Sequence, residues 1–130
     1  MTIPQHLIDA AIAASRNAHA PYSNYQVGCA ILTKDGNVTT GCNVENASYG
    51  LSNCAERTAI FTMVASGGSR DIEMVCVATR DGGSPCGACR QVLAEFGTDF
   101  LVASYAIESA KLQTWTVQQL LPDAFALKQS

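Results

Sequence analysis

NCAERTAIF, at residues 53–61, begins a largely apolar helix whose first turn holds a thiol, Cys54, and a carboxylate, Glu56. A carboxylate is not a usual choice for the interior of a small protein. A second stretch, SPCGACRQ at residues 84–91, places Cys86 and Cys89 at the start of another helix. Both helices follow loops, so their N-termini can converge on one point. A fold that brings them together would gather three thiols beside a carboxylate.

Four helices and five strands are predicted around these two stretches. Apolar residues at helical spacing and short apolar runs mark the elements, and Gly, Pro and Asp mark their ends. We expect helices over about residues 4–19, 54–66, 86–96 and 117–121, and strands over about 27–32, 38–44, 73–79, 100–104 and 111–115. The first two strands form a hairpin across the turn TKDGN, where Gly36 supplies a positive φ.

The predicted fold is an α/β sandwich in a single domain over residues 1–130. The last strand follows the fourth too closely for a parallel crossover, which needs about a dozen residues or more, so it should return antiparallel. The result is a mixed five-stranded sheet with helices packed on both faces.

Composition favours a packed domain that binds a small ligand. The chain has 130 residues, of which 48% are hydrophobic and 15% charged, and this is enough apolar material for a core. The net charge is −3 and the basic residues are scattered, whereas nucleic-acid-binding proteins usually show a clustered positive footprint. A neutral or weakly charged small molecule is therefore the favoured partner, and a nucleic acid is not expected.

The N-terminal segment predicts a cytoplasmic protein. MTIPQHLIDAAIAASRNAHA carries polar and charged residues through its apolar run, so it does not resemble a secretory signal. The sequence has no apolar stretch near the roughly 20 residues that span a bilayer, and no membrane association is expected. In the cytoplasm the six cysteines should stay reduced, which favours metal binding or catalysis over a disulfide framework.

Cys54, Cys86 and Cys89 form a soft ligand set that suits Zn²⁺. Three protein ligands leave a fourth position open, as in catalytic zinc sites, and Glu56 is placed to reach a water there and move protons. A structural zinc half-site is the alternative. It would need a fourth ligand, and neither His6 nor His19 has ligand spacing to the cysteines.

The other three cysteines, Cys29, Cys42 and Cys76, lie in predicted strands beside apolar residues. We interpret them as small core hydrophobes rather than as metal ligands.

The motifs C-A-E at residues 54–56 and P-C-G-A-C at residues 85–89 resemble the signature of zinc-dependent nucleoside and base deaminases. Three longer stretches resemble the small cytidine deaminases that act on free nucleosides: APYSNYQVG, GCNVENASYGLSNCAERTAIF and PCGACRQVLAEFG. The resemblance implies a cytidine-deaminase-like three-layer α/β/α sandwich with one Zn²⁺ per subunit. It also implies hydrolytic deamination of cytidine and 2′-deoxycytidine to uridine and 2′-deoxyuridine, with release of ammonia, in pyrimidine salvage.

The resemblance also implies roles for individual residues. Cys54, Cys86 and Cys89 would bind zinc, and Glu56 would be the proton shuttle. Arg57 would neutralise charge near the metal, and the ribose would be bound by Asn43 and Glu45. The base and its amino group would be contacted by Tyr25, the Ala55 backbone and the Ser84 backbone. In a homotetramer, the pocket of a neighbouring subunit would be completed by Ala47, Tyr49 and Phe125. For Phe125, a role as a core anchor of the C-terminal segment is an equal alternative.

Three positions depart from the family pattern, and three other functions remain open. Tyr25 stands where the family often has phenylalanine, Gln26 where proline is common, and His19 where relatives are often aromatic. Fine substrate preference is therefore open. The alternative functions are deamination of a cytosine-containing nucleoside antibiotic, deamination of a polynucleotide, which the acidic balance disfavours, and a non-catalytic zinc-binding module.

Overall fold

A single five-stranded sheet forms the centre of the computed structural model, which describes residues 2–129. Its strands are β1 (Gly28–Thr33), β2 (Val38–Cys42), β3 (Ile72–Thr79), β4 (Leu101–Ala106) and β5 (Lys111–Thr116). They lie in the order β2-β1-β3-β4-β5. β3 and β4 run parallel and the other neighbours run antiparallel, so the predicted mixed sheet and the antiparallel return of the last strand are confirmed.

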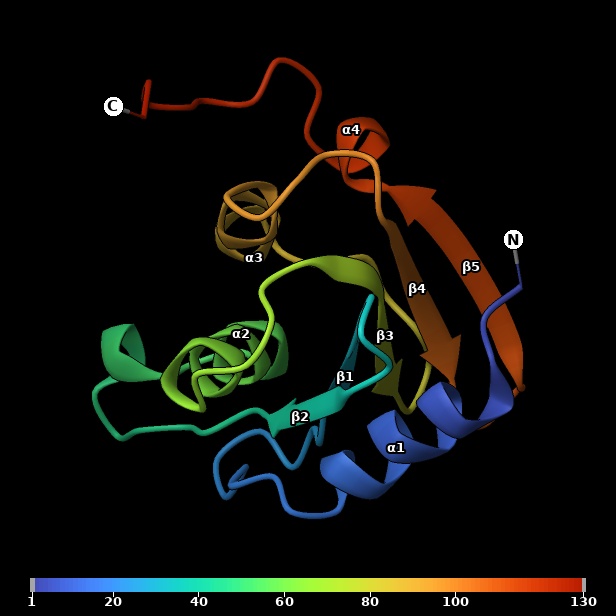
Figure 1. The fold of residues 1–130 in the computed structure, drawn as a ribbon. Helices are drawn as coiled ribbons and strands as arrows, with labels where there is room; N and C mark the ends of the chain where they lie inside the picture. Colours follow the sequence, from blue (N-terminus) through green and yellow to red (C-terminus); the bar gives the residue numbers. More distant parts are fainter. Residues whose placement is uncertain (1, 130) are drawn as a thin grey trace.

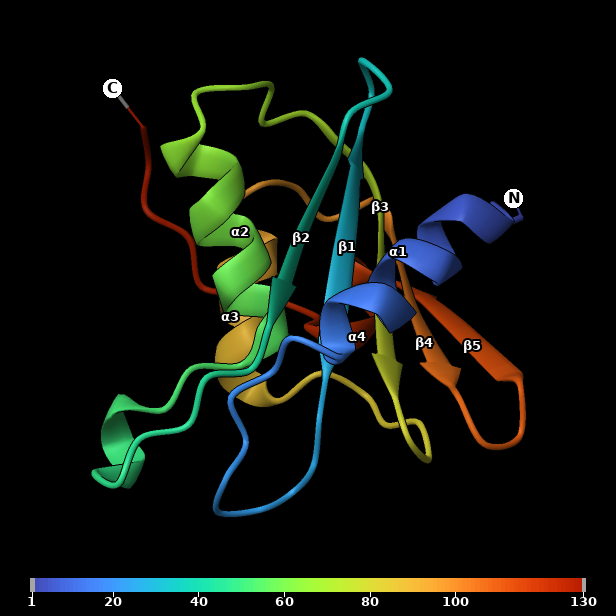
Figure 2. The same cartoon turned by 90° about the horizontal axis from the view of Figure 1, so that it is seen from below.

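Helices cover both faces of this sheet (Figures 1 and 2). They are α1 (Gln5–Ser15), α2 (Ala55–Ala65), α3 (Gly87–Ala94) and the short α4 (Val117–Leu120). α1 lies on one face, whereas α2 and α3 lie on the other. The three-layer α/β/α sandwich is therefore confirmed. Within residues 2–129, none of these helices is long and apolar enough to cross a bilayer.

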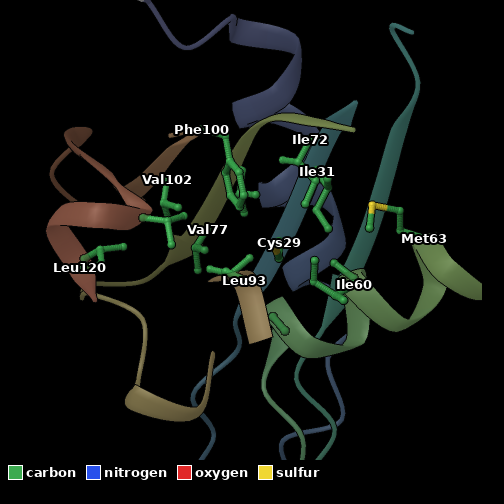
Figure 3. Packing of buried hydrophobic residues seen from close by; sticks show 14 residues of the cluster. Cys29, Ile31, Ile60, Met63, Ile72, Val77, Leu93, Phe100, Val102 and Leu120 are labelled. Atoms are coloured by element: carbon green, nitrogen blue, oxygen red, sulfur yellow. The ribbon is translucent and has the colours of Figure 1, made fainter. Parts of the chain in front are cut away.

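The sheet separates two apolar cores because successive residues of its central strands point to opposite faces. Cys29 and Ile31 of β1 join the core beneath α2 and α3, where they pack in one cluster with Ile60, Met63 and Leu93 (Figure 3). Ala30 and Leu32 of the same strand join the core beneath α1. Burial on both faces explains why β1 and most of β3, from Met74 to Ala78, are apolar runs.

Two glycines set how closely the helices approach the sheet. A side chain at Gly41 of β2 would collide with the backbone of Ala59 in α2. A side chain at Gly28 of β1 would collide with the backbone of Ala11 in α1. The missing methyl groups therefore allow helix backbone to lie directly on strand backbone, and this fixes the position of α2 against the sheet.

The structure corrects the predicted ends of several elements. α3 ends at Ala94 rather than at residue 96, and β4 continues to Ala106 rather than to residue 104. The helix predicted to reach residue 19 ends at Ser15, because His19 leaves the helix and its backbone pairs with Val44. The strand predicted to reach residue 44 ends at Cys42, since Val44 pairs with His19 and with Asn53 instead of extending the ladder. Cys42 is accordingly half-buried rather than a core residue, whereas Cys29 and Cys76 are fully buried as predicted.

Candidate metal and substrate site

The first turns of α2 and α3 converge, and each helix begins directly after a cysteine. Cys54 is the N-cap of α2, Cys86 is the N-cap of α3, and Cys89 lies in the first turn of α3. The three sulfur atoms lie within 4.8 Å of one another, and the Cys54 and Cys86 sulfurs are 3.9 Å apart. The structure therefore brings together the three thiols that the sequence motifs single out.

The sulfur spacing fits a tetrahedral zinc ion. A Zn–S distance of about 2.3 Å places two ligand sulfurs about 3.8 Å apart in tetrahedral geometry. In the described part of the chain, this group contains no fourth His, Cys, Asp or Glu ligand. Both histidines, His6 and His19, are exposed and lie outside it. The donor set is thus three thiols, which suits Zn²⁺ and leaves one coordination position for a non-protein ligand.

Positive charge is available on one side of the cluster. The Arg57 Nη2 atom donates to the Cys54 sulfur at 3.3 Å, while its Nε atom is buried and has no hydrogen-bond partner among the residues that the structure describes. The helix N-termini add positive partial charge, which favours thiolates. Hydrogen bonds from Cys89 and then from Arg57 lower the pKa of Cys54 to about 5. The same bond to Cys54, together with burial, raises the pKa of Cys89, so Cys54 is the first of this pair to ionise.

Glu56 lies beside the thiols and is only 5% exposed. Burial is the main cause that raises its pKa above the ordinary value, and the charge of Cys54 contributes in the same direction. A buried carboxyl with a raised pKa can both accept and return a proton near neutral pH. The arrangement therefore combines a metal-ligand set with an acid–base group.

A small cleft of about 180 Å³ opens over this arrangement. Its walls combine predicted metal-site and base-contacting residues, namely Tyr25, Cys54, Ala55, Glu56 and Ser84. The cleft lies where β1 and β3 meet the start of α2 and the loop before α3. One concave site therefore holds the acid–base group, one thiol and three of the residues predicted to contact a base.

The predicted ribose-binding pair lies outside this cleft and holds the segment that carries Tyr25. The Asn43 side chain accepts from the backbone N–H of Val27 at 2.9 Å and donates to the Tyr25 carbonyl at 2.8 Å. The Glu45 carboxylate accepts from the backbone N–H groups of Tyr22 and Ser23 at 3.0 and 3.1 Å, and from the Ser23 hydroxyl. Glu45 also lines a second cavity, of about 390 Å³, together with Tyr22 and Tyr49.

The residues predicted to serve a neighbouring subunit are turned toward solvent. Ala47 is exposed, Tyr49 is 80% exposed, and Phe125 is 68% exposed. Neither Tyr49 nor Phe125 lines the cleft of its own chain. The alternative reading of Phe125 as a core anchor is wrong, since its ring is exposed and only its carbonyl is held, by Gln91 at 3.1 Å.

Sequence reasoning missed two residues that support the site. Arg90 donates to the Pro85 carbonyl at 2.8 Å, to the Leu120 carbonyl at 2.7 Å and to the Ser84 hydroxyl at 3.0 Å, so it holds the loop before Cys86. Asp81 accepts from the Tyr25 hydroxyl. Arg90 could have been found from the sequence, because it directly follows the predicted metal ligand Cys89. No sequence pattern points to Asp81.

Comparison with known proteins identifies the arrangement. Residues 1–105 match the family model described as the cytidine and deoxycytidylate deaminase zinc-binding region. A cytidine deaminase from Halalkalibacterium halodurans is 49% identical over 123 residues, which cover 93% of this chain and 92% of that protein. A cytidine deaminase from Mycobacterium tuberculosis is 46% identical over 118 residues, with coverage of 88% and 83%.

The fold agrees with this match. The 1.6 Å crystal structure of a cytidine deaminase from Burkholderia pseudomallei superimposes with a TM-score of 0.89 at 45% identity, and the superposition covers 95% of this chain and 100% of that one.

Proposed function

Because this chain belongs to the zinc-binding cytidine and deoxycytidylate deaminase family, it catalyses the hydrolytic deamination of cytidine, and we propose that it also accepts 2′-deoxycytidine and serves pyrimidine salvage. One observation in the structure supports the deamination chemistry itself: three sulfurs at zinc-ligand spacing lie beside a buried carboxyl. Cytidine and water would give uridine and ammonia.

Cys54, Cys86 and Cys89 would hold the zinc ion, with Arg57 offsetting the negative charge of their thiolates. Bound Zn²⁺ would lower the pKa of a coordinated water to about 7 and so supply a nucleophile at neutral pH. The spacing of the sulfurs supports this ligand set. The buried Nε of Arg57 supports the charge-balancing role, because a cation with so few partners needs an anion close by.

Glu56 would carry protons between water and the base. It would take a proton from the attacking water and deliver it to ring N3 while the oxygen adds to C4. It would then pass the second water proton to the amino group, so that the C4–N bond breaks and ammonia leaves. The raised pKa of Glu56 supports both directions of transfer.

The other residues in and beside the cleft would recognise the nucleoside. The Ala55 and Ser84 backbone groups would contact the pyrimidine and its amino group, and Tyr25 would cover the ring, since all three line the cleft. Asn43 and Glu45 would bind the ribose hydroxyls. Both already hold the segment over residues 22–27 in place, so a bound ribose would join an existing hydrogen-bond network.

We further propose a homotetramer with shared active sites. At about 180 Å³ the cleft is smaller than the roughly 300 Å³ at which pockets for small organic ligands begin, so a neighbour would complete it. Ala47, Tyr49 and Phe125 are exposed and available for that purpose. An apolar groove of about 540 Å³ between α2 and α3, lined by Phe61, Val64, Val92 and Phe96, offers a surface for a second copy of the chain.

The cellular setting and the extent of the unit are also proposals. All six cysteines are free thiols, which supports a reducing compartment and hence the cytoplasm. Both apolar cores share one sheet, which supports a single domain over residues 1–130.

Ammonia release from cytidine, with and without a zinc chelator, tests the proposed function. The zinc-loaded protein should release ammonia and lose the ultraviolet absorbance of cytosine, and the chelator should abolish both. The same assay with 2′-deoxycytidine, and with a cytosine-containing nucleoside antibiotic in parallel, separates the substrates. A protein that binds zinc and processes none of the three would be a non-catalytic module, and the proposal would be wrong.

A further inference from the structure

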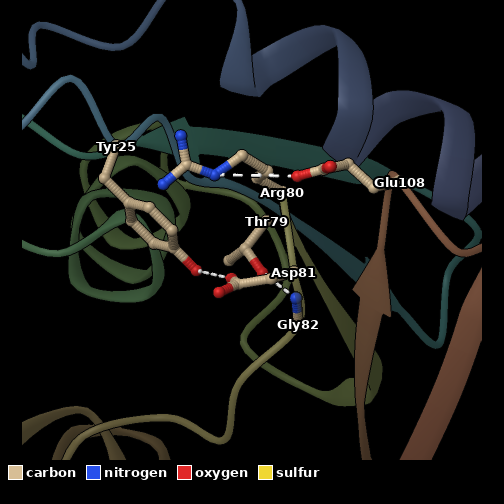
Figure 4. Close-up of polar contacts among 6 residues, drawn as sticks. All are labelled: Tyr25, Thr79, Arg80, Asp81, Gly82 and Glu108. Carbon is tan, nitrogen blue, oxygen red and sulfur yellow. Dashed lines mark hydrogen bonds and ion pairs between the residues drawn. The ribbon is translucent and has the colours of Figure 1, made fainter.

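Tyr25 and Asp81 join two walls of the cleft that lie 56 positions apart in the chain (Figure 4). The Tyr25 hydroxyl donates to the Asp81 Oδ1 atom at 2.5 Å. Tyr25 belongs to the segment that enters β1, and Asp81 belongs to the loop between β3 and α3, which also carries Ser84 and leads to Cys86. A single hydrogen bond therefore connects the aromatic wall of the cleft to the loop before two metal-ligating cysteines.

The backbone of the loop that carries Asp81 is held by hydrogen bonds to two buried hydroxyl groups of the sheet. Its Gly82 N–H donates to the hydroxyl of Thr79, which is buried, at 2.7 Å. The hydroxyl of Ser104, also buried, accepts from the Gly83 N–H at 3.1 Å and donates to the Gly83 carbonyl at 2.9 Å. Gly82 has φ +75°, and a side chain there would press on Ala106. Asp81 is therefore an acceptor on a fixed backbone.

The ring of Tyr25 is also held from one face. The guanidinium carbon of Arg80 lies 5.2 Å from the ring centroid, within the range of a cation–π contact. Arg80 is itself paired with Glu108 at 3.7 Å. Burial, and next the bond to Asp81, raise the pKa of Tyr25, so the hydroxyl stays protonated and remains the donor.

We propose that Asp81 is a positioning residue that, through the Tyr25 hydroxyl, holds the aromatic ring in its substrate-ready orientation before the nucleoside enters. The inference rests on the proposed function, because it takes the cleft as the place where the base binds. A ring fixed in advance does not have to be ordered by the substrate, so the benefit falls on binding rather than on the chemical step.

Kinetics of three single variants and one double variant test this role. Tyr25→Phe and Asp81→Ala each remove the hydrogen bond from one side, and each should raise KM for cytidine about 5-fold while kcat changes by less than about 2-fold. Asp81→Asn keeps a carbonyl acceptor and should restore most of the loss. The double variant Tyr25→Phe/Asp81→Ala should match the single variants, since both remove one contact. Additive effects in the double variant, or unchanged KM in both single variants, would overturn the proposal.

Asp35→Ala is the matched control. The Asp35 carboxylate accepts from the Thr33 hydroxyl at the same 2.5 Å, but in the exposed turn between β1 and β2, away from the cleft. This variant should keep the wild-type KM. A comparable rise of KM in Asp35→Ala would assign the effect to general loosening of the fold.

Calorimetric binding of cytidine separates this inference from the proposed function. With zinc bound, the Glu56→Gln protein should bind cytidine, and adding Asp81→Ala should raise the dissociation constant about 5-fold. If the wild type releases no ammonia but the dissociation constant still rises, only the proposed reaction is wrong. If the dissociation constant does not change, or if no cytidine binds, the positioning role is wrong.

Discussion

The Arg57 guanidinium lies one helical turn beyond Cys54 and touches its sulfur at 3.3 Å. Its Nε atom is buried and has no hydrogen-bond partner within residues 2–129. A cation held in this way is stabilised mainly by negative charge on the thiols. Arg57 and the sulfur cluster should therefore depend on each other.

Replacing Arg57 with Gln should weaken zinc binding by about 10- to 100-fold, the usual cost of losing a residue that supports a metal ligand. Competition against a chromogenic zinc chelator measures the affinity. Arg70→Gln, at an exposed position after α2, is the control and should bind zinc as the wild type does. Equal affinities in both variants would remove Arg57 from the site.

Replacing Glu56 with Gln should leave zinc bound and abolish most turnover. The amide cannot shuttle protons, and a positioned acid–base group is worth about 10²- to 10⁴-fold in rate, here for more than one transfer. Zinc content by metal analysis and ammonia release in parallel check both halves of the prediction. Glu73→Gln in β3 should retain the wild-type rate. Substantial activity in Glu56→Gln would show that another group moves the protons.

Replacing Arg90 with Lys should destabilise the protein although the charge is kept. Lys cannot reproduce the planar contacts to the Pro85 carbonyl, the Leu120 carbonyl and the Ser84 hydroxyl. Hydrogen bonds from charged groups are worth about 1.5–3 kcal/mol each, so we expect the free energy of unfolding in urea to fall by about 2–3 kcal/mol. Arg70→Lys is the matched surface control. No difference between the two variants would mean that the loop before Cys86 is held by other contacts.

Stability should fall as the pH rises above about 8.5, in part because of Cys76. Burial raises the pKa of this thiol to about 12, whereas an unfolded cysteine ionises near 8.5. Between these values the unfolded state binds fewer protons than the folded state, so this one residue lowers the free energy of unfolding by up to about 1.4 kcal/mol per pH unit.

Urea unfolding at pH 8, 9 and 10 under reducing conditions measures this slope. Cys76→Ala should be less stable at pH 8, because it leaves a small cavity, but should lose less stability as the pH rises. Parallel pH dependences in the two proteins would contradict the prediction.

Local patterns predicted most of the fold, because they are written in consecutive residues. The buried parts of β1 and β3 are apolar runs, and α2 and α3 begin at the cysteines that the spacing marks. The end of α1 was mispredicted because residues 16–18 have an ordinary helical composition. What ends the helix is the pairing of His19 with Val44, which exists only in the folded chain.

The residues of the candidate site also fall into those that the sequence predicts and those that it does not. The thiols and Glu56 lie within short motifs, so their proximity could be inferred from two loop-to-helix junctions. The partners of Glu45 and Tyr25 could not be inferred, because Glu45 binds backbone N–H groups and Tyr25 binds an aspartate far along the chain. Contacts of this kind depend on how the loops are folded and leave no periodicity in the sequence.

The contact between Gly41 and Ala59 has a consequence for engineering. It sets how deeply the start of α2 lies against β2, and β2 leads directly into the segment of Asn43 and Glu45. Added bulk at position 41 would push the first turn of α2, which carries Cys54, away from the segment of Asn43 and Glu45. Selection for activity on enlarged pyrimidine nucleosides should therefore include libraries at positions 41 and 59, behind the cleft, as well as substitutions of its lining.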